Sequence, residues 1–592
     1  MTVHHRVSLA RASRRTVEVA VEASLPAGTG PQEVVFPVWT PGSYLVREHE
    51  RHVHDFQAYV DDRPVEVVKT AKNVYRLDAA GGRSLRVTYE VYAHELTVRT
   101  NHVDPSHAFL NPVALLPFLP GREGEAQTLE LTDLPTGWGA ACALPEPRLN
   151  TFAANDFDEL ADSPVECGPH ARPEARRRFT VRGVPHEIVL WGRTPLDVAR
   201  FEADCARIVE AQARLFGGLP YERYVVIAHA TDSGRGGLEH RASTALLFPR
   251  QSPAKPKGYE DLLSLFSHEL FHAWNVKRLK PAAFAPYDLT REALTRQLWA
   301  FEGLTSYYED IFLVRAGLMT RSRWLDIFGE RLTELERNPG RLRHSVEEAS
   351  FDAWIRYYRQ DENWNNSSTS YYLKGSLVGA LTDLALRRST HGSRSLDDVL
   401  RLAFERYAAK GVGVPEGALV DLVCVVGGEE LRPVLERALR SVDELPFDEV
   451  LSAHGLERVR RVPVGLDDKG GPAPSGSSLK CDIGVSLKYD GDRVRVSSLR
   501  RDSPAEAAGL CPGDELVAID DLRAETGSAL QRLHDRRPGE TARLTLFRRD
   551  ELLTVTVVAG EPRADAWQVR EAIGATPEAR ALGNAWLSPD AT

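Results

Sequence analysis

The run His268-Glu269-Leu270-Phe271-His272 carries two histidines four positions apart, with a glutamate directly after the first. On an α-helix, residues i and i+4 lie on one face about one turn apart, so His268 and His272 can present two imidazoles to one metal ion. Glu269 projects beside them, where a carboxylate can take a proton from water activated by the metal. The run therefore predicts a hydrolytic zinc site on a helix.

The residues around this run are almost all apolar, which predicts a buried helix. Inside such a helix a His-Glu-His cluster without a ligand would be costly, and this argues against a chance occurrence. His94-Glu95 begins the same pattern, but Val98 stands where the second histidine should be, in a segment predicted as a strand. We assign no function to that second run.

A hydrolytic zinc ion keeps three protein ligands and one open position, so a third ligand is expected. Glu302, 30 residues after His272, is the best candidate. It is the charged residue within Trp299-Ala300-Phe301-Glu302-Gly303, in a segment that predicts another amphipathic or buried helix, and a charge there needs a partner. An isolated glutamate would more commonly pair with an arginine or lie at a surface, but the zinc helix upstream favours a metal ligand.

Four segments together resemble the glycyl aminopeptidase family of zinc metallopeptidases, gluzincins that usually carry a C-terminal PDZ domain. The zinc run, extended to Arg278, and the segment around Glu302 match the family's zinc motifs. Gly236-Gly237-Leu238-Glu239-His240 resembles its version of the glycine-rich acidic motif of zinc aminopeptidases, and Tyr371-Tyr372-Leu373-Lys374-Gly375 resembles its Tyr-x-Lys-Gly motif. The motifs stand in the expected order, so the resemblance covers most of the chain.

The glycine-rich motif is expected to bind the substrate. Gly236 and Gly237 allow an extended backbone to run close beside a peptide, and the Glu239 carboxylate can pair with the protonated α-amine at its end. Such a contact would define an aminopeptidase. The alternative is a solvated glutamate in a glycine-rich turn, and His240 either supports Glu239 or touches the substrate.

Peptide hydrolysis also gains from a hydrogen-bond donor that faces the developing oxyanion. The resemblance implies that Tyr372 has this role. Adjacent helical residues face about 100° apart, so Tyr371 is expected to be structural. Without the Lys374-Gly375 match, aromatic core packing would be the preferred interpretation of both tyrosines.

The residues after the second histidine have less certain roles. The resemblance suggests Asn275 as a partner that orients a ligand imidazole, and this role stays open. Lys277, Arg278 and Lys280 stand ahead of Pro281, and we expect them to cap the helix, where cations offset the macrodipole.

Composition indicates a multidomain cytoplasmic protein. The chain has 592 residues, 27% of them charged, and its net charge of −10 provides no basic stripe for nucleic acid. Six cysteines without CxxC spacing are expected to be reduced thiols. The N-terminus lacks the apolar core of a signal peptide and the chain lacks an apolar run of 18 residues, so we expect the whole chain to be the mature protein, without a membrane segment.

The predicted fold class is α+β with several domains. An N-terminal antiparallel β domain is expected over 1–172, because apolar and polar residues alternate between Pro and Gly turns. A mainly helical, thermolysin-like zinc peptidase domain is expected over 173–462, with a strand region ahead of the zinc helix. Its helices are expected near 196–215, 258–280, 291–316, 371–388 and 395–409. A Gly/Pro/Ser linker over 463–480 leads to a PDZ domain over 481–560 and a tail over 561–592.

The PDZ prediction depends on Ser503-Pro504-Ala505-Glu506-Ala507-Ala508-Gly509-Leu510 and the Gly513-Asp514 segment that follows. The resemblance implies that this domain binds an extended C-terminal peptide or docks internally on the catalytic domain. In the tail, Thr576 as N-cap and Pro577 at the first helical position predict a short helix.

These observations predict a zinc aminopeptidase for peptides with a free N-terminus, with Gly or Ala preferred only because the resemblance implies it. Zn²⁺ would be held by His268, His272 and Glu302, and Glu269 would act as the base. The alternatives are a thermolysin-like endopeptidase, which would also cut N-terminally blocked peptides, and a non-catalytic scaffold in which the PDZ domain binds peptides.

Overall fold

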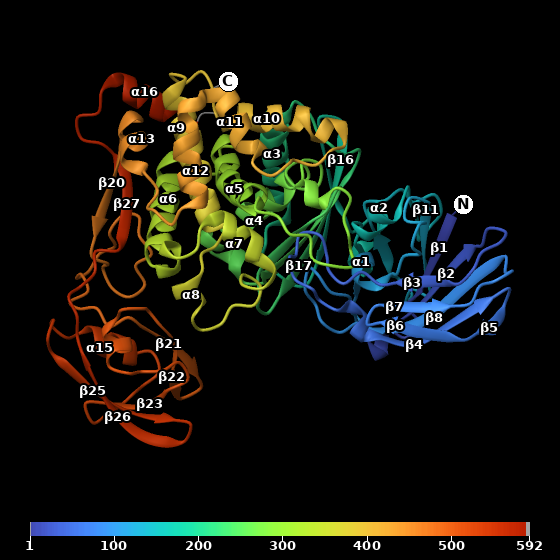
Figure 1. Ribbon diagram of the computed structural model, residues 1–592, viewed down its shortest axis with the longest axis horizontal. Helices are drawn as coiled ribbons and strands as arrows, with labels where there is room; N and C mark the ends of the chain where they lie inside the picture. Colours follow the sequence, from blue (N-terminus) through green and yellow to red (C-terminus); the bar gives the residue numbers. More distant parts are fainter. Residues whose placement is uncertain (1, 588–592) are drawn as a thin grey trace. The chain divides into compact units, whose positions relative to one another are not determined.

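The computed structural model describes residues 2–587, which form two compact units. The first runs up to Thr295 and includes Tyr308–Leu318 and Arg401–Glu416, and the second holds the remaining residues. Strands dominate the N-terminal part, helices the middle and strands again the PDZ region (Figure 1). The predicted α+β multidomain class is confirmed.

Three sheets form the N-terminal part, because alternating apolar and polar residues give strands with one buried face. β2 (Thr16–Ser24) and β8 (Ser84–Tyr92) pair antiparallel at the centre of the largest sheet, whose order is β13-β11-β1-β2-β8-β4-β5. Its other strands are β1 (Thr2–Ser8), β4 (Val53–Val60), β5 (Arg63–Val65), β11 (Ala126–Thr132) and β13 (Thr151–Ala154). The smaller sheets contain β12 (Gly139–Ala141), β14 (Val165–Gly168), β10 (Ala108–Leu110) and β9 (His102–Val103), and β3 (Gln32–Val35), β7 (Val74–Leu77) and β6 (Val67–Ala71).

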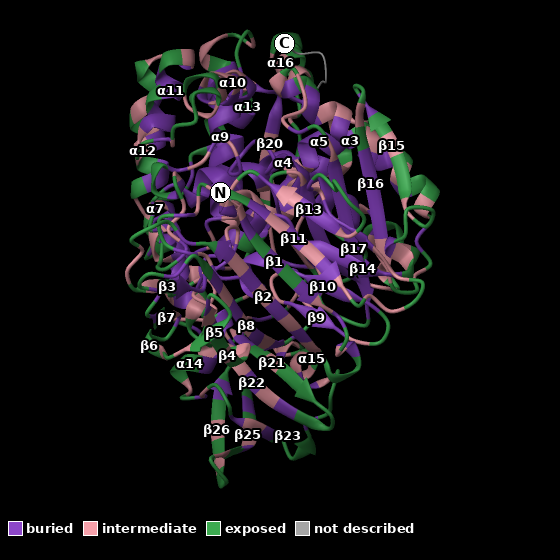
Figure 2. Ribbon diagram, turned by 90° about the vertical axis from the view of Figure 1, so that its right-hand side faces the viewer, coloured by how far each residue is buried: buried purple, intermediate pink, exposed green. Residues whose placement is uncertain are grey.

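A five-stranded mixed sheet precedes the zinc helix, as predicted. Its order is β15-β16-β17-β19-β18, and every residue of β17 is buried, as its purple ribbon in Figure 2 shows. The glycine-rich motif forms β18 at one edge of this sheet, where an added strand could pair. The strands are β15 (Arg177–Val181), β16 (Val184–Trp191), β17 (Tyr224–Thr231), β18 (Gly236–Glu239) and β19 (Ser243–Pro249).

The zinc helix is shorter than the sequence predicts. We expected a helix over 258–280, but α4 (Pro256–Phe271) ends one residue before His272. The backbone then turns, since the Lys277 N–H donates to the His272 carbonyl and Val276 has a φ of 125°, which no helix allows. This turn brings the following loop back over the end of the helix.

Helices fill the middle of the chain. α9 (Leu373–Ser389) and α10 (Leu396–Arg406) lie close to their expected positions, at 371–388 and 395–409. The other helices before the PDZ region are α1 (Pro112–Leu115), α2 (Phe157–Ala161), α3 (Val198–Phe216), α5 (Leu304–Arg315), α6 (Arg321–Glu336), α7 (Val346–Phe351), α8 (Trp364–Ser367), α11 (Ala418–Gly427), α12 (Arg432–Arg440) and α13 (Phe447–Ala453). Within residues 2–587, no helix combines the length and apolarity that crossing a bilayer requires.

The PDZ region has its own sheet and apolar core. Its elements are β21 (Val485–Asp490), β22 (Arg493–Leu499), α14 (Pro504–Ala507), β23 (Glu515–Ile519), β24 (Leu522–Arg523), α15 (Ala529–His534), β25 (Thr541–Arg548) and β26 (Glu551–Val558). The chain enters it after β20 (Leu456–Arg461) and leaves it before β27 (Ala566–Glu571), and these two strands pair. The predicted terminal helix is α16 (Pro577–Trp586), and the Thr576 side chain caps it by accepting from the Ala579 N–H.

Candidate metal centre and substrate site

Both histidines at the end of α4 are held by a hydrogen bond at the same ring nitrogen, Nδ1. His268 Nδ1 lies 2.6 Å from a carboxylate oxygen of Glu309, and His272 Nδ1 lies 2.7 Å from the backbone carbonyl of Asn275. An oxygen acceptor on Nδ1 fixes the proton there and leaves Nε2 to bind a metal. Asn275 thus orients an imidazole, but with its backbone carbonyl.

Glu302 lies in an unusual stretch of helix. Trp299–Gly303 form a π-helical turn (η6) that continues directly into α5, and such turns are frequent at functional sites. Glu302 is 2% exposed, and Glu309 follows it by seven residues, about two helical turns, so both carboxylates share one face. The same helix therefore carries a carboxylate that contacts His268 and a second one along the same face.

The three predicted ligands fit a zinc ion. His268, His272 and Glu302 offer one ligand atom each, and these atoms lie within 4.8 Å of one another. Two neutral imidazoles and one carboxylate are a donor set that zinc favours in hydrolytic sites, where a fourth position stays open. The carboxylate of Glu309 behind His268 adds the outer hydrogen bond that such ligands normally have.

Glu269 is positioned by the edge strand β18. It is 5% exposed, and a Cβ added to Gly237 would lie 2.0 Å from its Oε1. Only a glycine lets the strand pass this close to the carboxylate. Glu239, Glu269 and His272 also present atoms within 4.8 Å of one another, so the predicted base and the predicted amine ligand face the same small space.

One carboxylate oxygen of Glu239 is buried without a hydrogen bond from the described residues. The residue is 3% exposed, and no hydrogen bond from the described part of the chain reaches its Oε1. The N-terminal part of the chain covers it, because a Cβ on Gly42 would lie 2.3 Å from that oxygen. The loop around Gly42 is anchored by Trp39, whose indole N–H donates to the Asp288 carbonyl at 2.8 Å, and by Tyr44, whose ring stacks on Phe284.

A charged network lies beside Glu239. Asp162 Oδ1 accepts from the Lys277 ammonium at 2.9 Å and lies 3.0 Å from His240 Nδ1. Burial opposes the ionised form of Asp162, but Lys277 and His240 outweigh it and hold the pKa of this carboxyl well below its usual value. Lys277 is 2% exposed, so our expectation that it caps the helix is wrong, whereas Arg278 donates to the carbonyl of Ala273, two residues beyond the end of α4.

The Tyr-x-Lys-Gly motif lies at the start of α9. Tyr371 is fully buried, while Tyr372 is half-buried and its hydroxyl lies 3.3 Å from that of Tyr358. A Cβ on Gly375 would lie 2.9 Å from the Cα of Gly303, so the motif packs directly against the residue after Glu302. Burial lowers the pKa of Lys374 to about 8.

Sequence reasoning missed three functional positions. Glu309 could have been found from its spacing of seven residues after Glu302, which places both on one helical face. Asp162 and Gly42 are distant in sequence from the residues that they contact, and their local sequence patterns do not indicate those contacts. They become visible only in the folded chain.

Comparisons with known proteins cover most of the chain. Residues 4–169 match the peptidase M61 N-terminal domain, residues 261–378 match M61 glycyl aminopeptidase, and residues 481–558 match a PDZ domain. The crystal structure of an aminopeptidase N family protein from Idiomarina loihiensis is 31% identical in sequence, with a TM-score of 0.92. That similarity covers 99% of this chain and 100% of that chain.

Two other similarities are more limited. An M1 zinc metallopeptidase from Deinococcus radiodurans has 16% identity and a TM-score of 0.49 over 75% of this chain and 95% of its own. A putative zinc metalloprotease of Mesorhizobium japonicum is 39% identical over 61 residues, which is 10% of this chain and spans only 17% of that protein. The matched N-terminal and peptidase domains, with a relative aligned over its full length, show that this chain belongs to the M61 glycyl aminopeptidase family of zinc peptidases.

Proposed function

We propose that the protein is a zinc-dependent aminopeptidase that hydrolyses the first peptide bond of peptides with a free N-terminus and prefers a small first residue such as Gly or Ala. The observation that carries this proposal is the buried Glu239 oxygen without a donor. A buried carboxylate that lacks a hydrogen bond is costly, and the ammonium group of a peptide N-terminus would satisfy it. The preference for a small residue is supported by the family description alone.

The cover over Glu239 favours an aminopeptidase over an endopeptidase. The backbone of Gly42 lies against the carboxylate, as the short distance of its added Cβ shows. A substrate chain that continued beyond the amine would meet this backbone. Because β18 is an edge strand that ends at Glu239, a peptide pairing antiparallel to it would place its N-terminus at that carboxylate.

The chain's own residues supply the remaining chemistry. When bound by His268, His272 and Glu302, a zinc ion supplies Lewis-acid polarisation of the scissile carbonyl and lowers the pKa of water. A carboxylate oxygen of Glu269 takes the proton from the attacking water and passes it to the leaving amine. The Tyr372 hydroxyl donates a hydrogen bond to the developing oxyanion.

The decisive experiment compares hydrolysis of the peptide Gly-Ala-Phe with that of its N-acetylated form. We expect wild type to cleave only the free peptide, and Glu239→Gln to lose kcat/KM on it while keeping its zinc. Glu269→Gln serves as the control that abolishes turnover of the free peptide. Equal cleavage of both peptides by wild type would support the endopeptidase, and no cleavage by fully zinc-loaded protein would support the scaffold.

The PDZ region offers a second binding site. A pocket of about 320 Å³ lies between β21 and α15, at the groove where an extended peptide can add to the sheet. Pro463 and Leu466 of the linker also line it, and Asn366 bonds to the backbone of Leu499 and Arg501. These contacts favour internal docking of the PDZ region, with the groove open to a short peptide end.

A further inference from the structure

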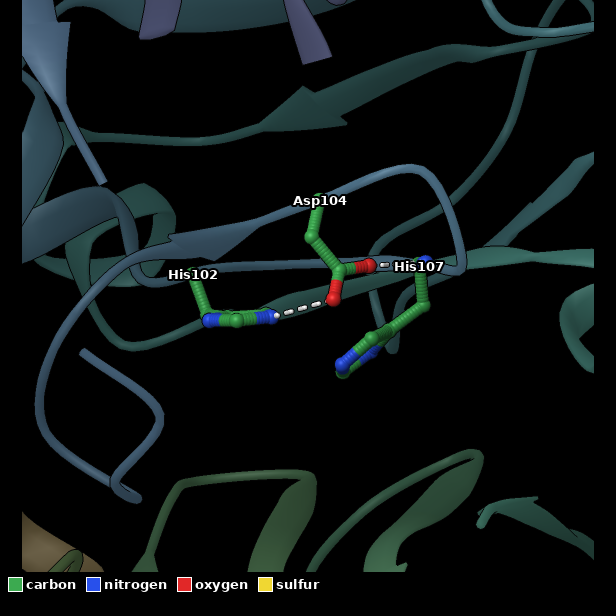
Figure 3. Close-up of side chains that lie close together, drawn as sticks. All are labelled: His102, Asp104 and His107. Atoms are coloured by element: carbon green, nitrogen blue, oxygen red, sulfur yellow. Dashed lines mark hydrogen bonds and ion pairs between the residues drawn. The ribbon is translucent and has the colours of Figure 1, made fainter. Parts of the chain in front are cut away.

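A second group of side chains that could hold a metal ion lies in the N-terminal part of the chain. His102, Asp104 and His107 offer one ligand atom each, within 4.8 Å of one another (Figure 3). They belong to the hairpin of β9 and β10, in which the Asp104 N–H donates to the His107 carbonyl. Because residues i and i+2 share a face of a strand and His107 stands opposite Asp104, all three side chains project from one face of this hairpin.

Each of the two imidazole rings has an oxygen acceptor at Nδ1, as the two histidines of α4 do. His107 Nδ1 lies 2.9 Å from a carboxylate oxygen of Glu166, and His102 Nδ1 lies 2.7 Å from the backbone carbonyl of His94. With the Nδ1 protons fixed by these acceptors, each Nε2 carries a free lone pair. Both Nε2 atoms are buried and find no hydrogen-bond partner within residues 2–587.

Asp104 has one oxygen in use and one available. Its Oδ1 accepts from the backbone N–H groups of Ser106 and His107 and so fixes the turn. Its Oδ2 lies 3.6 Å from His102 Nε2, which is longer than a hydrogen bond. Two atoms bound to one tetrahedral zinc at about 2.0–2.1 Å are separated by a similar distance.

The neighbouring group of His107, Glu166 and His229 is different. His107, His170 and His229 each place a ring nitrogen 2.7–2.9 Å from an oxygen of Glu166, which are ordinary hydrogen-bond distances. This carboxylate is therefore already occupied by donors. It acts behind His107 as Glu309 acts behind His268.

We propose that His102, Asp104 and His107 form a second metal site for a divalent first-row transition ion, zinc in the first instance, separate from the catalytic centre. Two imidazole nitrogens and one carboxylate exclude Mg²⁺ and Ca²⁺, which require oxygen ligands. Asp104 is partly exposed, so water completes the coordination from that side. The bound ion would fix the hairpin, and Glu166 would link it to His229 on the central strand β17.

Metal content of the purified full-length protein tests this site. We expect wild type to hold two zinc ions per chain, and Asp104→Asn and His102→Ala to hold one. His272→Ala should also hold one, because it loses the ion of the catalytic centre. His54→Ala, which alters an exposed histidine outside both groups, should keep both ions.

A second measurement does not depend on peptidase activity. In the His272→Ala background, adding zinc after chelation should raise the Tm, and adding Asp104→Asn should abolish this rise. Asparagine keeps the oxygen that accepts from the turn, so this variant should fold. A wild-type content of one zinc that His272→Ala removes entirely, with no Tm response in that variant, would overturn the proposal and leave the proposed peptidase function untouched.

Discussion

Replacement of Gly237 by alanine tests whether the edge strand positions the catalytic base. The added methyl carbon would lie 2.0 Å from Glu269 Oε1 and 2.3 Å from Cδ, whereas ordinary contact begins at 3.4 Å. The carboxylate must therefore move by about 1.4 Å. Gly237 has no positive φ, so alanine fits the backbone and the strand should form.

The expected loss of kcat follows from how strongly the rate depends on the position of the Glu269 carboxylate. A shift of about 1 Å in a reacting group costs roughly 10²-fold in rate, so we expect kcat to fall by at least about that factor. KM should change little, since the Glu239 carboxylate that would hold the amine is untouched. Zinc content should also be unchanged.

Steady-state kinetics on Gly-Ala-Phe with a matched variant provide the assay. Gly236→Ala is the comparison, because its Cβ would meet only Arg99 and Val98 atoms at 3.9 Å, and it should lose far less than Gly237→Ala. Equal losses in the two variants would show a general effect on the strand. A kcat of Gly237→Ala within about threefold of wild type would refute the positioning argument.

Three further predictions address the metal, the oxyanion and acid stability. Glu309→Ala should weaken zinc binding by about 10- to 100-fold in a chelator competition, since His268 loses its outer hydrogen bond; unchanged affinity would contradict this. Tyr372→Phe should lower kcat by about 10²-fold or more with zinc retained, and full activity would remove Tyr372 from the mechanism. Burial lowers the pKa of His5 from 6.5 to about 4. The unfolded chain therefore binds the extra proton first, and about 3 kcal/mol of stability should be lost as the pH falls from 6.5 to 4. Urea unfolding at several pH values should show this loss in wild type but a smaller one in His5→Gln, and equal losses would contradict it.

The sequence predicted those features that depend on local spacing. The zinc helix, the glycine-rich edge strand, the PDZ elements and the cap at Thr576 each follow from short patterns, and the structure contains all of them. The end of α4 was predicted too late, because nothing before Pro281 in the sequence marks a stop. The turn there depends on the carbonyl of Asn275 meeting His272 Nδ1, a contact that forms only once the chain folds back.

The remaining features depend on contacts between distant segments. Lys277 has the pattern of a capping residue, yet it is buried because Asp162, 115 residues earlier, meets its charge. The two histidines of the β9–β10 hairpin were not predicted as metal ligands for a similar reason. His102 and His107 have no helical spacing, and their shared orientation becomes evident only from the pairing of β9 with β10.

In the proposed function, the loop around Gly42 gives the N-terminal part of the chain a direct role in selecting the peptide. Its anchors Trp39 and Tyr44 contact Asp288 and Phe284 of the peptidase segment, so the wall beside Glu239 is assembled from two stretches 240 to 249 residues apart. A fragment that begins at residue 173 would carry the three proposed ligands of the catalytic zinc and the base but would leave Glu239 open to solvent. Truncation at this boundary should therefore yield a protein that still binds zinc but no longer restricts cleavage to the first peptide bond of its substrate.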